Sequence, residues 1–248
     1  MKNARFKILS VPVDAVTTTQ SIEFAKKNIL EGGQISILAV NPEKIITARR
    51  DQFLLETLDE SELLIPDGIG VVLTAKMKGI KSIKRVAGAD LMPELCSMAA
   101  NENFPVFLFG ASEEVNAKAA DILSKRFPAL KIAGRQNGYM ENNQYTNLVE
   151  RINASGAKLL FVALGSPRQE HFIKNFRKKL HVNVLQGVGG TFDVLSGNTR
   201  RAPLFFQKLN LEWFYRLLSN PTRIFRQTAL LKFIFLICID FLFSSKRD

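Results

Sequence analysis

The stretch AKLLFVALGSPRQEHFIKNFRKKLHVNVLQGVGG, residues 157–190, holds two apolar runs on either side of a polar and basic segment. Each apolar run is rich in Val, Leu or Phe and ends in a loop that contains glycine, which is typical of buried strands in a parallel sheet. The segment between the runs, RQEHFIKNFRKKL, is long enough for a helix. A strand, a helix and a second strand in this order predict a parallel sheet that carries helices on its faces.

The same alternation of apolar runs and helix-length segments covers most of the chain. QISILAV (34–40), LLI (63–65) and PVFLFG (105–110) predict further strands. ASEEVNAKAADILSKRF predicts a helix with Ser112 as its N-cap, because a serine side chain can accept a hydrogen bond from the first helical turn. We therefore expect an α/β fold in which a Rossmann-like parallel sheet has helices on both faces.

Two segments near the N-terminus are less regular. KILSVPVDAV (7–16) predicts a strand or a hairpin with a break at Pro12, since proline cannot donate a ladder hydrogen bond. NPEKIITARR (41–50) predicts the start of a helix, and DQFLLETLDESE (51–62) is expected to continue it.

Composition places the chain among globular proteins with an anionic partner. The chain has 248 residues, of which 46% are hydrophobic and 23% charged, and its formal net charge is +11. The positive charge would suit a nucleic acid, a nucleotide, an acidic lipid surface or a phosphorylated substrate. Two cysteines without a CxxC pair and only two histidines argue against a disulfide framework and a zinc or histidine-rich metal site. The N-terminus lacks the apolar run of a secretory signal.

The pattern changes at about residue 196, and we expect two parts: a core (1–195) and a basic, amphipathic, helical C-terminal appendage (196–248). The segment 200–248 holds nine Lys/Arg against three Asp/Glu. Its apolar run 229–243 has 15 residues and includes Lys232 and Asp240, whereas a spanning helix needs about 20 apolar residues. Basic and aromatic residues before this run predict binding at an anionic membrane surface. The alternative is that the run packs on the sheet or in an oligomer interface.

Four loops that follow predicted strands could hold a ligand, because ligands bind at the carboxyl ends of parallel strands. They are AVNPEK (39–44), PDGIG (66–70), GSPRQE (165–170) and GVGGTFD (187–193). Glycines such as Gly187 and Gly189 let the backbone approach a ligand closely, and the helix starts that follow present N–H groups to an anion such as a diphosphate. Neither GxGxxG nor GxxxxGK[ST] occurs, which argues against a dinucleotide fingerprint and a Walker P-loop.

Residues in these loops and in RVAGADL (85–91) allow structural or functional interpretations. Asp67 could be the N-cap of the following helix, or a general base that contacts a ligand at the end of its strand. Arg85 and Asp90 could form a surface pair, or Arg85 could hold a phosphate in its planar fork. Glu170 could simply complement the dipole of the helix that it opens.

Seven motifs together resemble those of a known family. PDGIGVV, RVAGADL, FLFGA, GSPRQE, GVGGTFDVLSG, RRAP and LEWFYRLLSNPTRIFR occur in this order, within a match from about Pro12 to Arg226. They are similar to the motif series of the WecG/TagA/CpsF glycosyltransferases of bacterial cell-surface polysaccharide synthesis. The resemblance implies transfer of an N-acetylmannosamine-type sugar, ManNAc or its uronic acid, from UDP to the GlcNAc of a polyprenyl-diphosphate-linked acceptor. Such enzymes build wall teichoic acid linkage units or enterobacterial common antigen, and we expect the product here to enter a teichoic acid linkage unit, common antigen or capsule.

The resemblance also implies roles for individual residues. The family's catalytic base falls on Asp67, and its substrate-binding positions fall on Asn41, Arg85, Gln169, Arg216, Arg223 and Arg226. The chain departs from the family at Ala39, where a threonine is frequent. We expect that departure to affect the identity of the donor sugar more than the reaction.

The chemistry of glycosyl transfer agrees with a role for Asp67 as the base. A base must take the proton of the acceptor hydroxyl, and positive charge must stabilise the departing diphosphate. No DxD motif is present, so we expect a reaction without metal or cofactor, and one base favours single displacement with inversion. The expected location is cytoplasmic, peripheral at the inner face of the cell membrane, with homo-oligomers possible and no nucleic-acid partner. The alternatives are a nucleotide-dependent Rossmann-type oxidoreductase and another UDP-hexose transferase.

Overall fold

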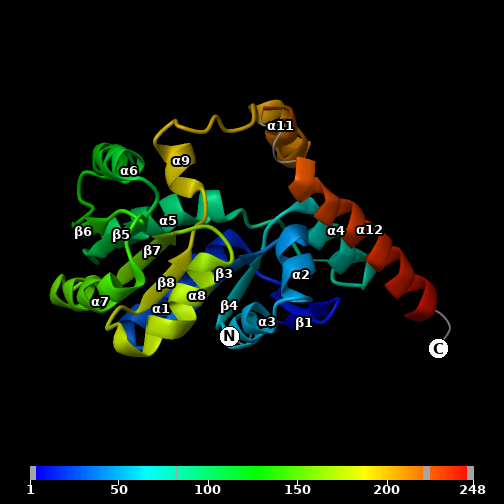
Figure 1. The fold of residues 1–248 in the computed structure, drawn as a ribbon, viewed down its shortest axis with the longest axis horizontal. Helices are drawn as coiled ribbons and strands as arrows, with labels where there is room; N and C mark the ends of the chain where they lie inside the picture. Colours follow the sequence, from blue (N-terminus) through cyan, green and yellow to red (C-terminus); the bar gives the residue numbers. More distant parts are fainter. Residues whose placement is uncertain (1–3, 82, 210, 220–223, 245–248) are drawn as a thin grey trace.

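A six-stranded sheet in which all strands run parallel forms the centre of the molecule (Figure 1). The computed structural model describes residues 4–244 except 82, 210 and 220–223. In sheet order, the strands are β4 (Leu63–Pro66), β3 (Ile35–Val40), β8 (Val184–Gly187), β7 (Leu159–Ala163), β5 (Val106–Gly110) and β6 (Ile132–Gln136). The prediction of an α/β fold with a parallel sheet is thus confirmed.

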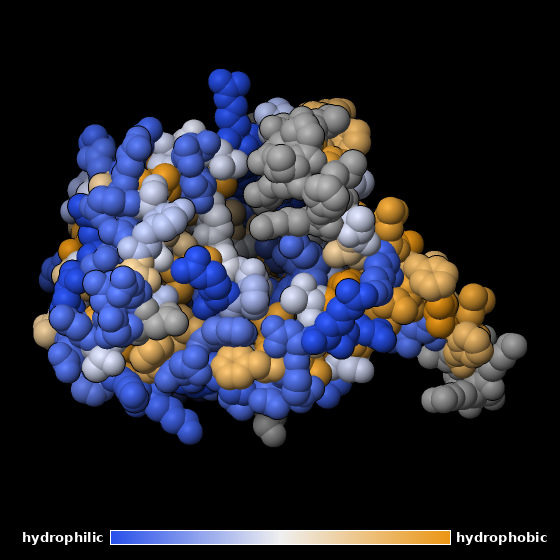
Figure 2. Space-filling model, in the orientation of Figure 1, coloured by the Kyte–Doolittle hydropathy of each residue, from blue (hydrophilic) through white to orange (hydrophobic). Residues whose placement is uncertain are grey.

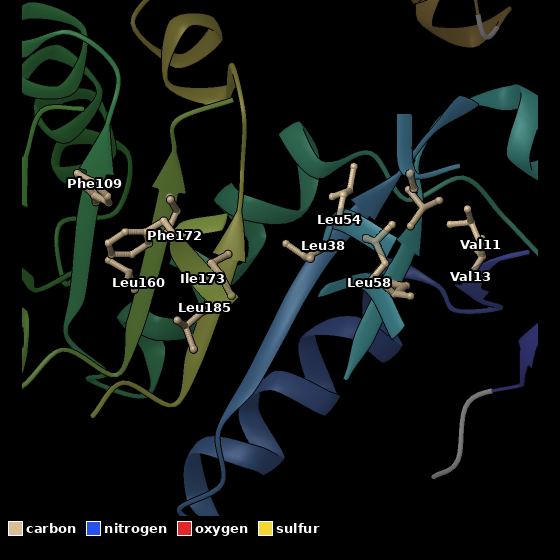
Figure 3. Close-up of a cluster of buried hydrophobic side chains, with 14 of the residues drawn as sticks. Val11, Val13, Leu38, Leu54, Leu58, Phe109, Leu160, Phe172, Ile173 and Leu185 are labelled. Atoms are coloured by element: carbon tan, nitrogen blue, oxygen red, sulfur yellow. The ribbon is translucent and has the colours of Figure 1, made fainter. Parts of the chain in front are cut away.

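Side chains of the central strands alternate between two buried clusters, one on each face of the sheet. In β3, Leu38 and Val40 join the first cluster, whereas Ile35 and Ile37 join the second. Figure 3 shows part of the first cluster, in which Leu38 lies among residues from β5, β7, β8, α3 and α8. Because both faces of the strands are covered, their sequences are apolar almost throughout.

Helices cover both faces, as expected from the sequence. On the first face lie α2 (Pro42–Ala48), α3 (Gln52–Asp59), α4 (Ile69–Met77), α7 (Tyr145–Ala154), α8 (Arg168–Phe176) and α12 (Ile224–Ser244). On the second lie α1 (Thr18–Leu30), α5 (Gly88–Asn101), α6 (Glu113–Arg126) and α9 (Thr191–Leu195). The remaining helices are α10 (Leu204–Lys208), α11 (Glu212–Ser219) and the short 3₁₀ turns η1 (Asn142–Gln144) and η2 (Arg177–Lys179). Ser112 caps α6 by accepting a hydrogen bond from the Val115 N–H, as predicted.

The N-terminal segment is a hairpin of β1 (Arg5–Ile8) and β2 (Val11–Asp14). The expected break at Pro12 is wrong, because Pro12 lies within β2 opposite Lys7, and the chain turns instead at Leu9 and Ser10, which both have positive φ. The hairpin is held to the large sheet by Asp14, whose carboxylate accepts a hydrogen bond from the Leu64 N–H at 2.7 Å.

The expected continuous helix after residue 41 is also wrong. It is divided into α2 and α3 at Arg49–Asp51, where the Asp51 side chain accepts a hydrogen bond from the Leu54 N–H at 3.0 Å and caps α3. An aspartate that can satisfy a first-turn N–H starts a new helix more readily than it continues an old one. Because the helix is divided, α2 can pack against α12 while α3 packs against α8.

The C-terminal helix α12 packs against the core along one side and exposes the other. Phe233 and Ile237 are buried, and Phe233 lies beside Gly70 at the start of α4. Asp240, which interrupts the apolar run, pairs with Lys78 at 2.8 Å. In Figure 1, α12 runs diagonally past α2 and α4, and in Figure 2 its outer surface carries hydrophobic side chains. Of the described helices, none combines the length and apolar character needed to cross a bilayer. The boundary at residue 195 stays a prediction.

Gly110, the last residue of β5, lies very close to the backbone of β7, and its substitution can test how tightly the two strands pack. Its φ is +118°, and a Cβ there would overlap the carbonyl group of Ala163. Gly110→Ala adds this backbone overlap to the strain of a positive φ, so we expect the free energy of unfolding to fall by about 3 kcal/mol or more in urea denaturation. The control Gly156→Ala has a φ of +68° and nothing within 4 Å of the new Cβ, so it should cost about 1–2 kcal/mol. Equal losses would contradict this account.

Candidate active site

Three loops meet at the carboxyl ends of adjacent strands. Asp67 follows β4, Asn41 follows β3, and Gly189 lies two residues beyond the end of β8. The Asp67 N–H donates to the Val40 carbonyl at 2.9 Å, which holds the first two loops side by side. The parallel register of β3 with both neighbours thus brings together residues that are distant in the sequence.

Asp67 is not a helix cap, so that hypothesis is wrong. Gly68 is the N-cap of α4 and has no side-chain capping bond; its φ of +96° turns the chain between Asp67 and the helix. The Asp67 carboxylate accepts a hydrogen bond from the Gly88 N–H at 3.5 Å, at the first residue of α5. Its side chain is 26% exposed, and it is therefore accessible at the end of its strand.

Arg85 lies between two carboxylates. Its Nε is 3.6 Å from Asp67 Oδ1, and its Nη2 donates to Glu212 at the start of α11. Burial of the guanidinium by itself would lower its pKa, but the charge of Asp67 and the hydrogen bond and charge of Glu212 outweigh burial and raise the pKa of Arg85. The hypothesis of a surface pair with Asp90 is wrong, because Asp90 pairs with Arg201 at 2.6 Å and acts on Arg85 only as a more distant charge.

Asn41 begins α2 and lies beside the Asp67 loop. Its Oδ1 accepts a hydrogen bond from the Lys44 N–H at 2.8 Å, and Pro42 follows in the first turn. A Cβ at Gly68 would lie 3.9 Å from Asn41 Cβ, so the two loops are in contact. The cap fixes the position of Asn41 next to Asp67.

Gln169 is buried beneath the β8 loop and connects it to α8. Its Oε1 accepts a hydrogen bond from the Gly189 N–H at 2.9 Å, and its Nε2 donates to Glu170 at 3.0 Å. A Cβ at Gly187 would lie only 2.8 Å from Gln169 Nε2, so glycine is needed there for the side chain to fit. The structure therefore brings Gln169, Gly187 and Gly189 together.

A buried ion pair, which the sequence did not suggest, connects α2 and α8, two helices that begin at these loops. Lys44 Nζ lies 2.6 Å from Glu170 Oε1, and the side chains are 5% and 0% exposed. Burial by itself would raise the pKa of Glu170, but the charge of Lys44 and the hydrogen bonds from Lys44 and Gln169 lower it. Glu170 thus does more than complement a helix dipole, and nothing in the NPEK or PRQE motifs indicates this partnership.

The appendage reaches the site through Glu212. Arg223 lies outside the described residues, and the structure describes Arg216 and Arg226 only as backbone of α11 and α12. Glu212, which the sequence interpretation overlooked, contacts both Arg85 and Arg201. The sequence did contain a feature that could have indicated Glu212, because it is one of three acidic residues in the basic segment 200–248.

Two adjoining surface hollows, each of about 500 Å³, lie at the other half of the sheet. They surround the loop from β6 to α7, and Arg168 at the start of α8 lines one of them. Residues 66–70 line neither hollow. These hollows are therefore separate from the contacts around Asp67.

One comparison with known proteins covers nearly the whole chain. Residues 6–247 match the model of the glycosyl transferase WecG/TagA/CpsF family. The match includes both the parallel sheet and α10–α12, so the sheet and the appendage belong to one family pattern. It overturns the oxidoreductase alternative.

Lys44→Met should strongly destabilise the protein, because it leaves the buried Glu170 carboxylate without its cation. We expect the free energy of unfolding to fall by about 3–5 kcal/mol at pH 7. The folded-state pKa of Glu170 is below its ordinary value of 4.5, so the stabilisation by the pair is complete above that value and is lost as the pH falls through the folded-state pKa. The difference between wild type and variant should therefore shrink below pH 4.5.

The control for this measurement is Lys125→Met. Lys125 pairs with Asp121 at 2.7 Å, but their side chains are 73% and 54% exposed, so water screens the pair and the free energy of unfolding should hardly change. Urea denaturation at several pH values measures both variants. A pH-independent difference for Lys44→Met would show that the pair contributes by packing and not by charge.

Proposed function

The chain belongs to the WecG/TagA/CpsF family of glycosyltransferases, and from that premise we propose a specific reaction. The family uses a nucleotide-sugar donor and a lipid-linked acceptor in polysaccharide synthesis. The proposed donor is UDP with an N-acetylmannosamine-type sugar, ManNAc or its uronic acid. The proposed acceptor is a polyprenyl-diphosphate-linked GlcNAc, and the product would enter a teichoic acid linkage unit, common antigen or capsule.

The observation that carries the mechanism is the position of Asp67 at the carboxyl end of β4, held by the Gly88 N–H and facing Arg85. In the proposed reaction, Asp67 takes the proton of the acceptor hydroxyl as its oxygen attacks the anomeric carbon. The bond from that carbon to the diphosphate breaks, and UDP leaves with the electron pair. Attack from the face opposite the leaving group inverts the anomeric configuration.

Positive charge and backbone N–H groups are proposed to stabilise the diphosphate. Arg85 lies beside Asp67, and α5, which has 14 residues, begins at the same point with Gly88. The partial positive charge of a helix N-terminus favours a phosphate. We assign the same role to Arg216, Arg223 and Arg226 on the strength of the motif resemblance, and we propose that no metal takes part because the sequence has no DxD motif.

Ala39 is the position that we connect with donor identity. It is the penultimate residue of β3, and a Cβ at Gly88 would lie 3.6 Å from its methyl group and 4.0 Å from Asp67 Oδ2. A threonine here would therefore place a hydroxyl next to the start of α5 and near the proposed base. Alanine removes that hydrogen-bonding group, so we leave open another UDP-hexose as the donor.

The outer surface of α12 is proposed to contact the membrane in which the acceptor is anchored. Its exposed large side chains are apolar: Leu231, Ile234, Phe235, Leu242 and Phe243. Figure 2 shows hydrophobic side chains gathered along the projecting helix. An apolar face with basic residues nearby favours insertion into an anionic interface. An oligomer interface over the same surface is the alternative.

Asp67→Asn should lower kcat about 10²- to 10⁴-fold, because the amide cannot accept the proton. The measurement is UDP release from several UDP-sugars in the presence of a polyprenyl-diphosphate-GlcNAc analogue, together with NMR of the product's anomeric carbon. Asp121→Asn, in an exposed pair on α6, serves as the control and should leave kcat unchanged. Full activity of Asp67→Asn would remove Asp67 as the base, and a retained anomeric configuration would contradict single displacement.

Leu231→Ser combined with Phe235→Ser should weaken binding to phosphatidylglycerol-containing vesicles about tenfold or more, because two apolar side chains no longer enter the interface. Vesicle sedimentation measures the bound fraction. The control Leu30→Ser with Tyr139→Ser changes two other exposed apolar residues, 65% and 80% exposed, and should bind like wild type. Unchanged vesicle binding together with loss of a dimer in sedimentation velocity would assign this surface to an oligomer interface.

A further inference from the structure

Glu212 joins two guanidinium groups that come from separate parts of the core. Its Oε2 accepts a hydrogen bond from Arg85 Nη2, and its Oε1 is 3.5 Å from Arg201 Nε. Arg85 lies between α4 and α5, whereas Arg201 follows α9. The Glu212 side chain is only 7% exposed. One carboxylate therefore occupies the space between two cations, next to the Asp67 loop.

The two guanidiniums are not saturated by Glu212, even though Arg85 also faces Asp67 and Arg201 also pairs with Asp90. Among the described residues, the buried Nε atoms of both Arg85 and Arg201 have no hydrogen-bond acceptor. A buried donor without an acceptor is costly. The site therefore has more donors than the two oxygens of Glu212 satisfy, and an anion with more oxygens would fit it better.

We propose that Arg85 and Arg201 form one binding site for a diphosphate, and that Glu212 occupies this site until the ligand displaces it. The natural ligand is the diphosphate of the nucleotide-sugar donor, so the identity of that ligand rests on the proposed function. A diphosphate carries more acceptor oxygens than a carboxylate and more negative charge, and guanidinium forks bind such oxygens in pairs. Arg201 is thereby a diphosphate-binding residue in addition to Arg85.

Displacement of Glu212 would also change the position of α11 on the core. Glu212 is the first residue of α11, and the ion pairs with Arg85 and Arg201 connect this helix to the core. Figure 1 shows α11 on the same side of the molecule as α9, beyond an extended connection. Binding of the diphosphate is thus coupled to movement of the appendage, because one site cannot hold both anions.

The chain carries its own reporter of this movement. Trp213 is the only tryptophan in the sequence and follows Glu212 directly. It is 39% exposed and packs on Phe214, with 5.7 Å between the ring centroids. Its fluorescence emission should therefore change when α11 shifts on the core.

The test uses inorganic pyrophosphate, which has neither sugar nor nucleoside, with the full-length protein. Titration calorimetry measures its affinity for wild type, Glu212→Gln and Arg201→Gln. Glu212→Gln removes the competing charge and should bind pyrophosphate about tenfold tighter, whereas Arg201→Gln should bind about tenfold more weakly. Glu113→Gln is the matched control, because Glu113 also pairs with an arginine, Arg135, which lies on β6 at the edge of the sheet opposite β4. The pyrophosphate affinity of this variant should equal that of wild type.

Trp213 fluorescence provides the second measurement. Pyrophosphate should shift the emission of wild type, and Glu212→Gln without ligand should already resemble the pyrophosphate-saturated wild type. If Glu212→Gln does not fold, the fluorescence titration of the wild type still tests the proposal. An unchanged Trp213 emission at saturating pyrophosphate overturns it. Equal or weaker pyrophosphate affinity in Glu212→Gln, unchanged affinity in Arg201→Gln, or no binding by any variant also overturns it.

These outcomes are separate from those of the proposed function. Pyrophosphate binding that follows the expected order, without transfer from any UDP-sugar, would support the anion site and contradict the proposed reaction. Transfer that depends on Asp67, without the expected change in Glu212→Gln, would support the reaction and overturn the role of Glu212.

Discussion

Parallel pairing of β3 with both β4 and β8 is the constraint on which the site depends. Because all three strands point the same way, the loops with Asn41, Asp67 and Gly189 emerge at one edge of the sheet. The buried ion pair of Lys44 and Glu170 then fixes the helices that begin at this edge. A buried pair is costly to break, since either partner alone would be an uncompensated charge. Loop position is therefore connected directly to core stability.

A series of contacting side chains, alternately acidic and basic, extends from this edge of the sheet into the appendage. Asp67 faces Arg85, Arg85 contacts Glu212, Glu212 lies beside Arg201, and Arg201 pairs with Asp90. These residues come from the β4 loop, the segment before α5, the segment after α9 and the start of α11. The family match over 6–247 likewise includes sheet and appendage. The site is thus built by both parts of the chain, and charge holds them together.

Much of the fold could be predicted because local signals agreed with the final structure. Apolar runs indicated the strands, and Ser112 indicated the start of α6. The two wrong predictions concern residues that are compatible with two local structures. Pro12 can sit in a strand when the ladder does not need its N–H, and Asp51 can begin a new helix instead of continuing the previous one. The sequence pattern alone cannot rank such options, since tertiary packing selects between them.

The sequence by itself determined the parallel α/β architecture, the family and the loops in which the site lies, because strand composition and motif order are local and read directly from the chain. Only the tertiary structure decided which charges meet. Lys44 and Glu170 are 126 residues apart, and Arg85 and Glu212 are 127 apart, so no spacing rule links them. Which carboxylate faces which cation follows from strand order and helix packing, and these bring distant charges into a space from which water is largely excluded.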